Sequence, residues 1–306
     1  MDTRFTGVIP PVITPFTASG DVDYDDLDKI IDHLIDGGMH GLFVLGSSGE
    51  VAYLTDAERD EIVKRTVARA AGRVPVLAGA IDTTAKRVIE HAKRAEALGA
   101  GGIVATCPFY AINDEEEFAA HFRAIAAAVS IPVFAYDVPV RLGGRKLSRD
   151  LLVRLGTEGV IAGVKDSSGD DVGFRRLVAA NKKAGHPLAL LSGHELMVDG
   201  MLLLGADGFV PGYGNVEPRP YREMWDASRE GDWARVRDIQ DKIAADFETV
   251  FAVKGRSGDA TGIGAFKTAM VELGIIKSIN MAFPIKPLEG ANKEAVVAIM
   301  KEEGLI

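Results

Sequence analysis

One cysteine, Cys107, stands in a chain of 306 residues, so no disulfide framework can form within the chain. Basic residues are also in deficit: 35 lysines and arginines face 44 aspartates and glutamates, for a formal net charge of −9. This balance argues against a nucleic-acid-binding protein, which needs a clustered basic face. No apolar run approaches the roughly 18 residues of a membrane span, and the first ten residues lack a signal-peptide pattern. We therefore expect a cytoplasmic protein with neither a nucleic-acid nor a membrane partner.

Patterns typical of metal sites and nucleotide loops are missing as well. The six histidines form no close ligand pair and Cys107 stands alone, so the sequence predicts no metal site. No Gly-Lys dipeptide occurs, which excludes a Walker A loop, and no Gly-x-Ser-x-Gly elbow is present. Metal-dependent, P-loop and serine-hydrolase chemistries therefore have no support in the sequence.

Glycine, by contrast, is abundant: 34 of 306 residues, or about 11% against a usual ~7%. Pairs of glycines recur in segments 98–103, 155–160 and 204–209, each after helical apolar spacing and before a short apolar run. A glycine at the end of a helix adopts the left-handed conformation without steric penalty. The repeated pattern indicates the end of a helix, a tight turn and the start of a strand.

Eight short apolar runs lack strict alternation, as expected of parallel strands covered on both faces. They alternate with helical segments, such as the apolar stripe within residues 27–35 and the helices that Thr55 and Ser148 would cap. Eight such units predict an α/β fold, the (β/α)8 TIM barrel, with a doubly wound open sheet as the competing fold. The eight runs are residues 7–14, 41–45, 74–78, 102–106, 132–136, 160–165, 188–191 and 208–211.

The last 75 residues continue beyond the eight units. Segments 233–251, 265–273 and 293–303 have helical spacing, and a glycine-rich loop over 255–264 separates the first two. No linker-like composition precedes them. We therefore predict a catalytic barrel over residues 1–231 and a docked C-terminal helical extension over residues 232–306.

Lys165 follows an uncharged strand and would project into the mouth of the barrel, where TIM-barrel active sites lie. A lysine held there loses solvation, which favours the neutral amine, a nucleophile toward carbonyl groups. This position predicts Schiff-base catalysis. A strand-end lysine that pairs with Asp166 or faces water is an equally open interpretation of the position alone.

Residues 46–49, Gly-Ser-Ser-Gly, follow another strand and offer hydroxyls and backbone N–H groups. Such a loop can hold a carboxylate or phosphate, although an ordinary tight turn is the more common outcome.

Tyr136, also at a strand end, could transfer a proton, and Arg141 on the next loop could hold a carboxylate. A tyrosine that reaches the barrel rim and an exposed loop arginine are the alternatives.

Taken together in this order, these motifs resemble the dihydrodipicolinate synthase / N-acetylneuraminate lyase family, the pyruvate-dependent class I aldolases. The similarity covers nearly the whole chain. The matching segments are 7–16 (GVIPPVITPF), 46–50 (GSSGE), 136–139 (YDVP) and 163–166 (GVKD).

The resemblance implies that Lys165 forms the Schiff base and that Tyr136 transfers the proton. It makes Ser47 and Ser48 the hydroxyl residues that hold the pyruvate carboxylate, and gives Ser48 a link from Tyr136 to Tyr110 of a neighbouring subunit. Gly193 and the carbonyl of Val210 match positions that line the pyruvate pocket. The resemblance also implies no metal or organic cofactor and a homotetramer built as a dimer of dimers.

The second half of the substrate is less well defined. Arg141 matches the arginine with which dihydrodipicolinate synthases bind their second substrate. Against that, the serine pair replaces the threonine pair common in those synthases. Residues 108–111 and 165–168 look more like catabolic lyases acting on sialic acid or 2-keto-3-deoxy sugar acids. After Gly193, Glu195 supplies one carboxylate where the sialic-acid subgroup has two.

We therefore expect an enzyme, a carbon-carbon lyase that releases pyruvate from a 2-oxo acid. The alternatives are dihydrodipicolinate synthase, which condenses pyruvate with aspartate semialdehyde, and a 2-keto-3-deoxy acid dehydratase. A barrel that only binds a small acid is the non-enzymatic alternative.

Overall fold

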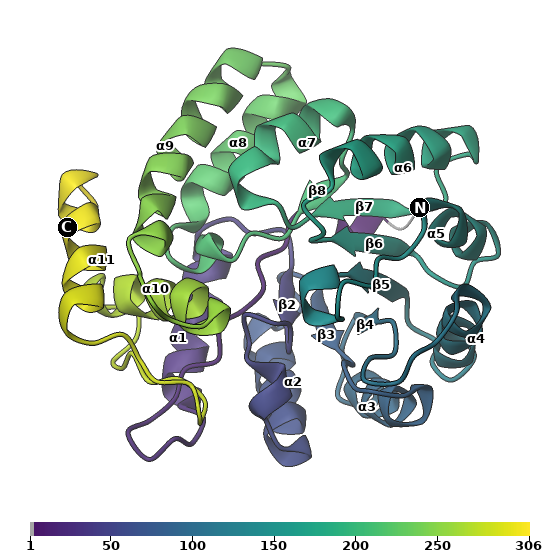
Figure 1. The fold of residues 1–306 in the computed structure, drawn as a ribbon, viewed down its shortest axis with the longest axis horizontal. Helices are drawn as coiled ribbons and strands as arrows, with labels where there is room; N and C mark the ends of the chain where they lie inside the picture. The colour runs from purple at the N-terminus through teal and green to yellow at the C-terminus, as the bar shows by residue number, and fades with distance from the viewer. Residues whose placement is uncertain (1–2) are drawn as a thin grey trace.

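The computed structural model describes residues 3–306, in which eight parallel strands form one curled sheet in the order β1-β8-β7-β6-β5-β4-β3-β2. Pro11 bridges Phe43 of β2, and the Phe43 N–H donates to Pro10 O at 3.1 Å, so the segment after β1 joins the sheet's two edges. Figure 1 shows the strands at the centre with helices around them. The predicted (β/α)8 barrel is confirmed. The strands are β1 Gly7–Val8, β2 Leu42–Val44, β3 Val76–Gly79, β4 Gly102–Thr106, β5 Val133–Asp137, β6 Gly163–Asp166, β7 Ala189–Ser192 and β8 Gly208–Phe209.

The strands overlap all eight predicted runs, but several are shorter. The first run ends after Val8 because Pro10 and Pro11 have no N–H to continue the ladder. The run 160–165 joins the sheet only at Gly163, since the N–H groups of Val160 and Ile161 both donate to Leu155 O at the end of the preceding helix. Prolines set the first of these boundaries, and turn hydrogen bonds, which the apolar pattern does not record, set the second.

The barrel helices begin where the capping residues are. Thr55 and Glu58 form the predicted capping box of α2, and Ser148 Oγ accepts the Leu151 N–H at 3.1 Å at the start of α5. Gly99 and Gly205 have φ of 92° and 106°, as the helix-to-turn pattern requires. Gly156 instead lies inside α5, and Gly159 (φ 73°) makes that turn. The barrel helices are α1 Tyr24–Asp36, α2 Asp56–Ala70, α3 Ala85–Ala97, α4 Glu115–Ala126, α5 Arg149–Thr157, α6 Asp171–Lys183, α7 Val198–Leu204 and α8 Pro218–Glu230.

Three further helices run along one side of the barrel in Figure 1: α9 Trp233–Phe251, α10 Gly258–Glu272 and α11 Gly290–Glu302. The expected glycine-rich loop over 255–264 is wrong from residue 258 onward, because α10 begins at Gly258. Ser257 caps that helix through the Ala260 N–H at 3.3 Å, and Gly264 allows close packing against Leu288. The division at residues 231 and 232 stays a prediction.

One continuous core includes the barrel interior and the inner faces of the helices, with Phe43, Phe134 and Phe209 fully enclosed. Among residues 3–306, no helix is both long enough and apolar enough to span a membrane.

Candidate active site

Lys165 and Tyr136 stand side by side at the carboxyl ends of β6 and β5, where their Cα atoms are paired in the sheet register. Both side chains are buried, and Lys165 Nζ lies 4.2 Å from the centre of the Tyr136 ring and 5.0 Å from that of Phe43. The amine therefore lies in an aromatic enclosure inside the barrel. Of the two interpretations of Lys165, the structure favours the inward-facing one.

The phenol of Tyr136 has polar partners despite its burial. Ser47 Oγ lies 3.4 Å from its hydroxyl oxygen. Burial is the strongest single influence and raises its pKa, but the charge of Lys165 and hydrogen bonds from Ser47 and Ser167 together bring the pKa of Tyr136 below its ordinary value. A phenol in this state exchanges a proton with a bound reactant more readily than a free tyrosine does.

The predicted carboxylate loop follows β2 at the same end of the barrel. The contact with Tyr136 that the resemblance implies for Ser48 is made by Ser47. Leu45 has a left-handed backbone (φ 59°), which resets the alternation of side chains after the strand. Thr14 Oγ1 donates to Gly49 O at 2.8 Å and fixes the far end of the loop, while Ser48 lies partly buried beside Ser47.

A buried ion pair holds this loop from behind. Glu50, also left-handed (φ 54°), pairs with Lys267 of α10, and neither side chain is exposed to solvent. Glu50 Oε2 also accepts the Ala282 N–H at 2.8 Å, and Lys267 Nζ donates to Asn280 O at 2.9 Å. Burial lowers the pKa of Lys267, and the contact with Glu50 opposes that shift. The C-terminal helices thus fix the position of the loop that carries Ser47.

Gly193 and Val210 lie just beyond the ends of β7 and β8. The Gly193 N–H donates to Asp166 O at 2.7 Å, and the Val210 N–H to Ser192 O at 2.8 Å. A Cβ atom at residue 193 would lie 2.1 Å from Ser167 Oγ, so only glycine leaves room for that hydroxyl. Gly193 thus lies beside the end of β6, which carries Lys165, and Val210 beside the end of β7. Their place in the pyruvate pocket stays a prediction.

Glu195 places a carboxyl group on the same side of the barrel. Its Oε2 accepts the Tyr213 N–H at 2.7 Å and faces the Tyr221 hydroxyl at 3.4 Å. Burial raises the pKa of Glu195 to about 7, although the N–H donors and the charge of Lys165 act against that rise. This carboxyl can carry a proton near neutral pH.

Arg141 ends the short 3-10 helix η3 (Pro139–Arg141) after β5 and forms an ion pair with Asp259 of α10. Hydrogen bonding to Asp259 is the main cause that raises the pKa of Arg141. Both residues line a cavity of about 150 Å³ that also contacts Ser47, Tyr53 and Thr106. Arg141 thus lies at the predicted site, where it is already paired with Asp259.

Of the predicted site residues, Ser47 and Arg141 line this cavity. Tyr110 does not. It lies on the loop between β4 and α4 with φ of 71°, and its side chain is 96% exposed. Within the chain it contacts neither Tyr136 nor Ser48 in any hydrogen bond that the structure shows.

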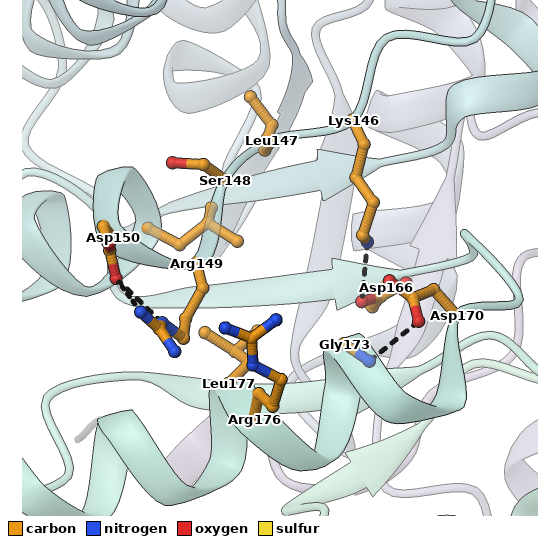
Figure 2. A pocket seen from close by; sticks show the side chains of 11 residues that line it. Lys146, Leu147, Ser148, Arg149, Asp150, Asp166, Asp170, Gly173, Arg176 and Leu177 are labelled. Carbon is orange, nitrogen blue, oxygen red and sulfur yellow. Dashed lines mark hydrogen bonds and ion pairs between the residues drawn. The ribbon is translucent and has the colours of Figure 1, made fainter.

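Two aspartates directly after the central pair face away from it. Asp137 follows Tyr136 and Asp166 follows Lys165, and Lys146 Nζ lies 2.6 Å and 3.5 Å from their carboxylates. Burial raises the pKa of Asp137, while the ion pair with Lys146 opposes that rise. Figure 2 shows Lys146 reaching toward Asp166 in a second cavity of about 370 Å³ between α5 and α6. That cavity lies behind the strand ends, so it is not the candidate active site.

No group of three or more histidine, cysteine, aspartate or glutamate side chains within residues 3–306 has the arrangement of a metal site. The chemistry described below uses side chains of the chain itself.

Comparison with known proteins agrees with this arrangement. Residues 4–303 match the Dihydrodipicolinate synthetase family. The chain belongs to this family. It is 34% identical over 308 residues to a 4-hydroxy-tetrahydrodipicolinate synthase of Phenylobacterium zucineum, with complete coverage of both chains. It is 33% identical over 301 residues to YagE of Escherichia coli K12, provisionally named as a 2-dehydro-3-deoxy-D-gluconate aldolase, with 97% of each chain covered.

A crystal structure of YagE in complex with pyruvate matches with a TM-score of 0.92 at 31% identity and 99% coverage of both chains. The prediction of a dihydrodipicolinate synthase-type enzyme, a pyruvate-dependent class I aldolase with a TIM-barrel fold, is therefore confirmed. The roles of individual residues stay predictions.

Sequence reasoning missed three members of this site. Ser167 follows Lys165 by two residues, so strand alternation alone could have placed it on the same face. Asp259 and Lys267 come from α10 and reach residues more than 100 positions earlier, at Arg141 and Glu50. No local pattern marks such long-range pairs.

Proposed function

We propose that the enzyme cleaves a 2-keto-3-deoxy sugar acid by a retro-aldol reaction that releases pyruvate. The observation that carries this proposal is the placement of Lys165 Nζ against the Tyr136 ring, with Ser47 on the phenol. A buried amine and a buried phenol meet there with a partly buried hydroxyl. Those are the groups that Schiff-base cleavage requires.

The steps follow from these groups. Lys165 Nζ attacks the C2 ketone, and loss of water forms an iminium ion. The C3–C4 bond then breaks: its electrons move into the iminium to give an enamine, while Tyr136 accepts the proton of the C4 hydroxyl and an aldehyde departs. Tyr136 returns a proton to C3, and water hydrolyses the iminium to pyruvate and free Lys165.

The substrate carboxylate lies at the loop of Ser47 and Ser48 in this proposal. Their hydroxyls and backbone N–H groups supply local donors, which a protein of net charge −9 needs in order to bind an anion. Gly193 and Val210 complete the pocket around the pyruvate half. Glu195 would meet a hydroxyl of the distal half.

Similarity to YagE, together with the single carboxylate of Glu195, supports a sugar acid over sialic acid. The alternative is 4-hydroxy-tetrahydrodipicolinate synthase. It is favoured by Arg141 and by relatives of that name, such as the Phenylobacterium protein.

A homotetramer built from tight dimers is part of the proposal, as is a cytoplasmic location. Tyr110 and Ile112 of one loop are 96% and 90% exposed, which suits a loop that inserts into a neighbouring subunit. Tyr110 would then reach Tyr136 of that neighbour through Ser48.

Trapping with borohydride tests the proposal. Incubation with pyruvate and borohydride should add the reduced adduct to Lys165, and Lys165→Ala should prevent it, while Lys64→Ala, at an exposed lysine of α2, serves as the lysine control. Unmodified Lys165 in the wild type would refute the Schiff base. A panel of 2-keto-3-deoxygluconate, sialic acid, and pyruvate with aspartate semialdehyde then separates the substrates; turnover of the last alone would establish the synthase.

A further inference from the structure

The cavity that Ser47 borders is also lined by an ion pair between the barrel and the C-terminal helices. Arg141 ends η3, and Asp259 is the second residue of α10. The Asp259 side chain is 14% exposed and that of Arg141 is 43% exposed. The guanidinium in this cavity is therefore already neutralised by a carboxylate of the same chain.

Tyr53 of the short helix η2 (Val51–Tyr53) shares this corner. Burial, followed by the charge of Asp259, raises the pKa of Tyr53, so its hydroxyl keeps its proton. The corner then presents N–H groups of Arg141, the O–H of Tyr53 and the oxygens of Asp259. It offers donors and acceptors together with no net charge.

This corner belongs to the same cavity as the carboxylate loop. Ser47, Arg141 and Asp259 all line the cavity of about 150 Å³. A 2-oxo acid attached to Lys165, with its carboxylate at Ser47, therefore extends its remaining carbons toward the ion pair. This step rests on the proposed function.

The charge balance at this corner decides which terminal groups of a substrate fit there. A free arginine is the preferred partner of a carboxylate, but here a second substrate carboxylate must displace Asp259 or lie against its negative charge. A hydroxyl both donates and accepts, so it can bond to Asp259 and to Arg141 while the ion pair stays intact. Aspartate semialdehyde, whose carboxylate would need Arg141, meets the same obstacle.

We propose that Asp259 is a specificity-determining residue that selects 2-oxo acids with a hydroxylated, uncharged far end over those with a second carboxylate. The C-terminal helices thereby set the substrate class of a barrel whose reacting groups lie on β5 and β6.

A competition on Lys165 tests this without requiring turnover. Equal concentrations of 6-hydroxy-2-oxohexanoate and 2-oxoadipate, which differ only in the terminal group, are trapped with borohydride, and mass spectrometry gives the ratio of the two adducts. Wild type is compared with Asp259→Asn, Asp259→Ser and the control Asp238→Asn, which removes an exposed pair with Arg237 on α9. Circular dichroism verifies that each variant is folded. Two different substitutions at residue 259 keep the test usable if one of these variants does not fold.

We expect both Asp259 variants to shift the adduct ratio at least tenfold toward 2-oxoadipate, and the Asp238 variant to match wild type. A ratio within twofold of wild type in a folded Asp259 variant, or a shift toward the hydroxylated acid, overturns the role of Asp259 alone. Absence of an adduct with pyruvate itself overturns the proposed function and this inference with it. The two failures are thus distinguishable.

Discussion

Lys146 Nζ lies 2.6 Å from Asp137 Oδ2, and Asp137 is the residue directly after Tyr136 in β5. The same ammonium lies 3.5 Å from Asp166, directly after Lys165 in β6. One lysine behind the barrel mouth thus connects the ends of both strands that carry the reacting groups; Figure 2 shows its contact with Asp166. The Asp137 side chain has no solvent exposure, so breaking its ion pair with Lys146 lowers the stability of the folded protein.

Lys146→Met should destabilise the protein. It removes the cation beside a fully buried carboxylate, and we expect the free energy of unfolding to fall by about 2–3 kcal/mol. Urea denaturation measures this. The control, Lys64→Met, breaks an exposed pair with Glu61 and should cost less than about 1 kcal/mol. Equal losses in the two variants would show that Lys146 does not stabilise Asp137.

Tyr136→Phe should separate binding from proton transfer. Lys165 keeps its aromatic neighbour, so borohydride trapping of pyruvate should persist, while kcat for cleavage should fall about 10²- to 10⁴-fold. Steady-state kinetics and adduct mass give the two readouts. Tyr24→Phe on α1 serves as the control and should leave both unchanged. A kcat within tenfold of wild type would remove Tyr136 from the proton path.

Glu195→Gln should change how stability depends on pH. Burial raises the pKa of Glu195 from 4.5 to about 7 in the folded protein, so its contribution is fully present below pH 4.5 and is lost as the pH rises through 7. The variant lacks that loss. Its free energy of unfolding, minus that of wild type, should therefore rise by about 1–3 kcal/mol from pH 4.5 to 8. Denaturation at several pH values measures the difference, and a flat difference contradicts the assignment.

Gly193→Ala should impair the pyruvate pocket through Ser167. The added methyl group meets Ser167 Oγ, so the hydroxyl must move, and kcat/KM should fall about 10- to 100-fold. In a Ser167→Ala background, which lacks that hydroxyl, Gly193→Ala should cause a smaller fold loss. Gly262→Ala, where a Cβ atom meets nothing within 4 Å, is the matched control and should leave kcat/KM unchanged. An equal fold loss in both backgrounds would disprove the steric cause.

The sequence predicts features that depend on local repetition. Eight strand-and-helix units, the caps at Thr55 and Ser148, and the inward position of Lys165 all follow from periodicity and from residues a few positions apart. The strand boundary set by turn hydrogen bonds to Leu155 and the start of α10 at Gly258 do not. Their hydrogen bonds are local, but the apolar pattern does not record which backbone groups pair. The family resemblance supplied the expected roles of Ser47 and Arg141, but not the partner of Arg141.

Asp259 and Lys267 show why the rest of the site lay beyond prediction. Their partners, Arg141 and Glu50, are 118 and 217 positions away. An exposed Asp near a helix start is ordinary in sequence, as is a lysine on a helix. Only three-dimensional packing distinguishes these two from other charged residues.

The buried contact between Glu50 and Lys267 also bears on the order in which the enzyme becomes functional during synthesis. Domains emerge from the ribosome N-terminus first, and the loop at Ser47 is made long before Lys267 exists. Until α10 has been translated and docked, Glu50 has no cation to meet in the interior. A nascent chain with all eight strands complete should therefore lack an ordered carboxylate loop, and binding of 2-oxo acids should begin only after the final helices have emerged.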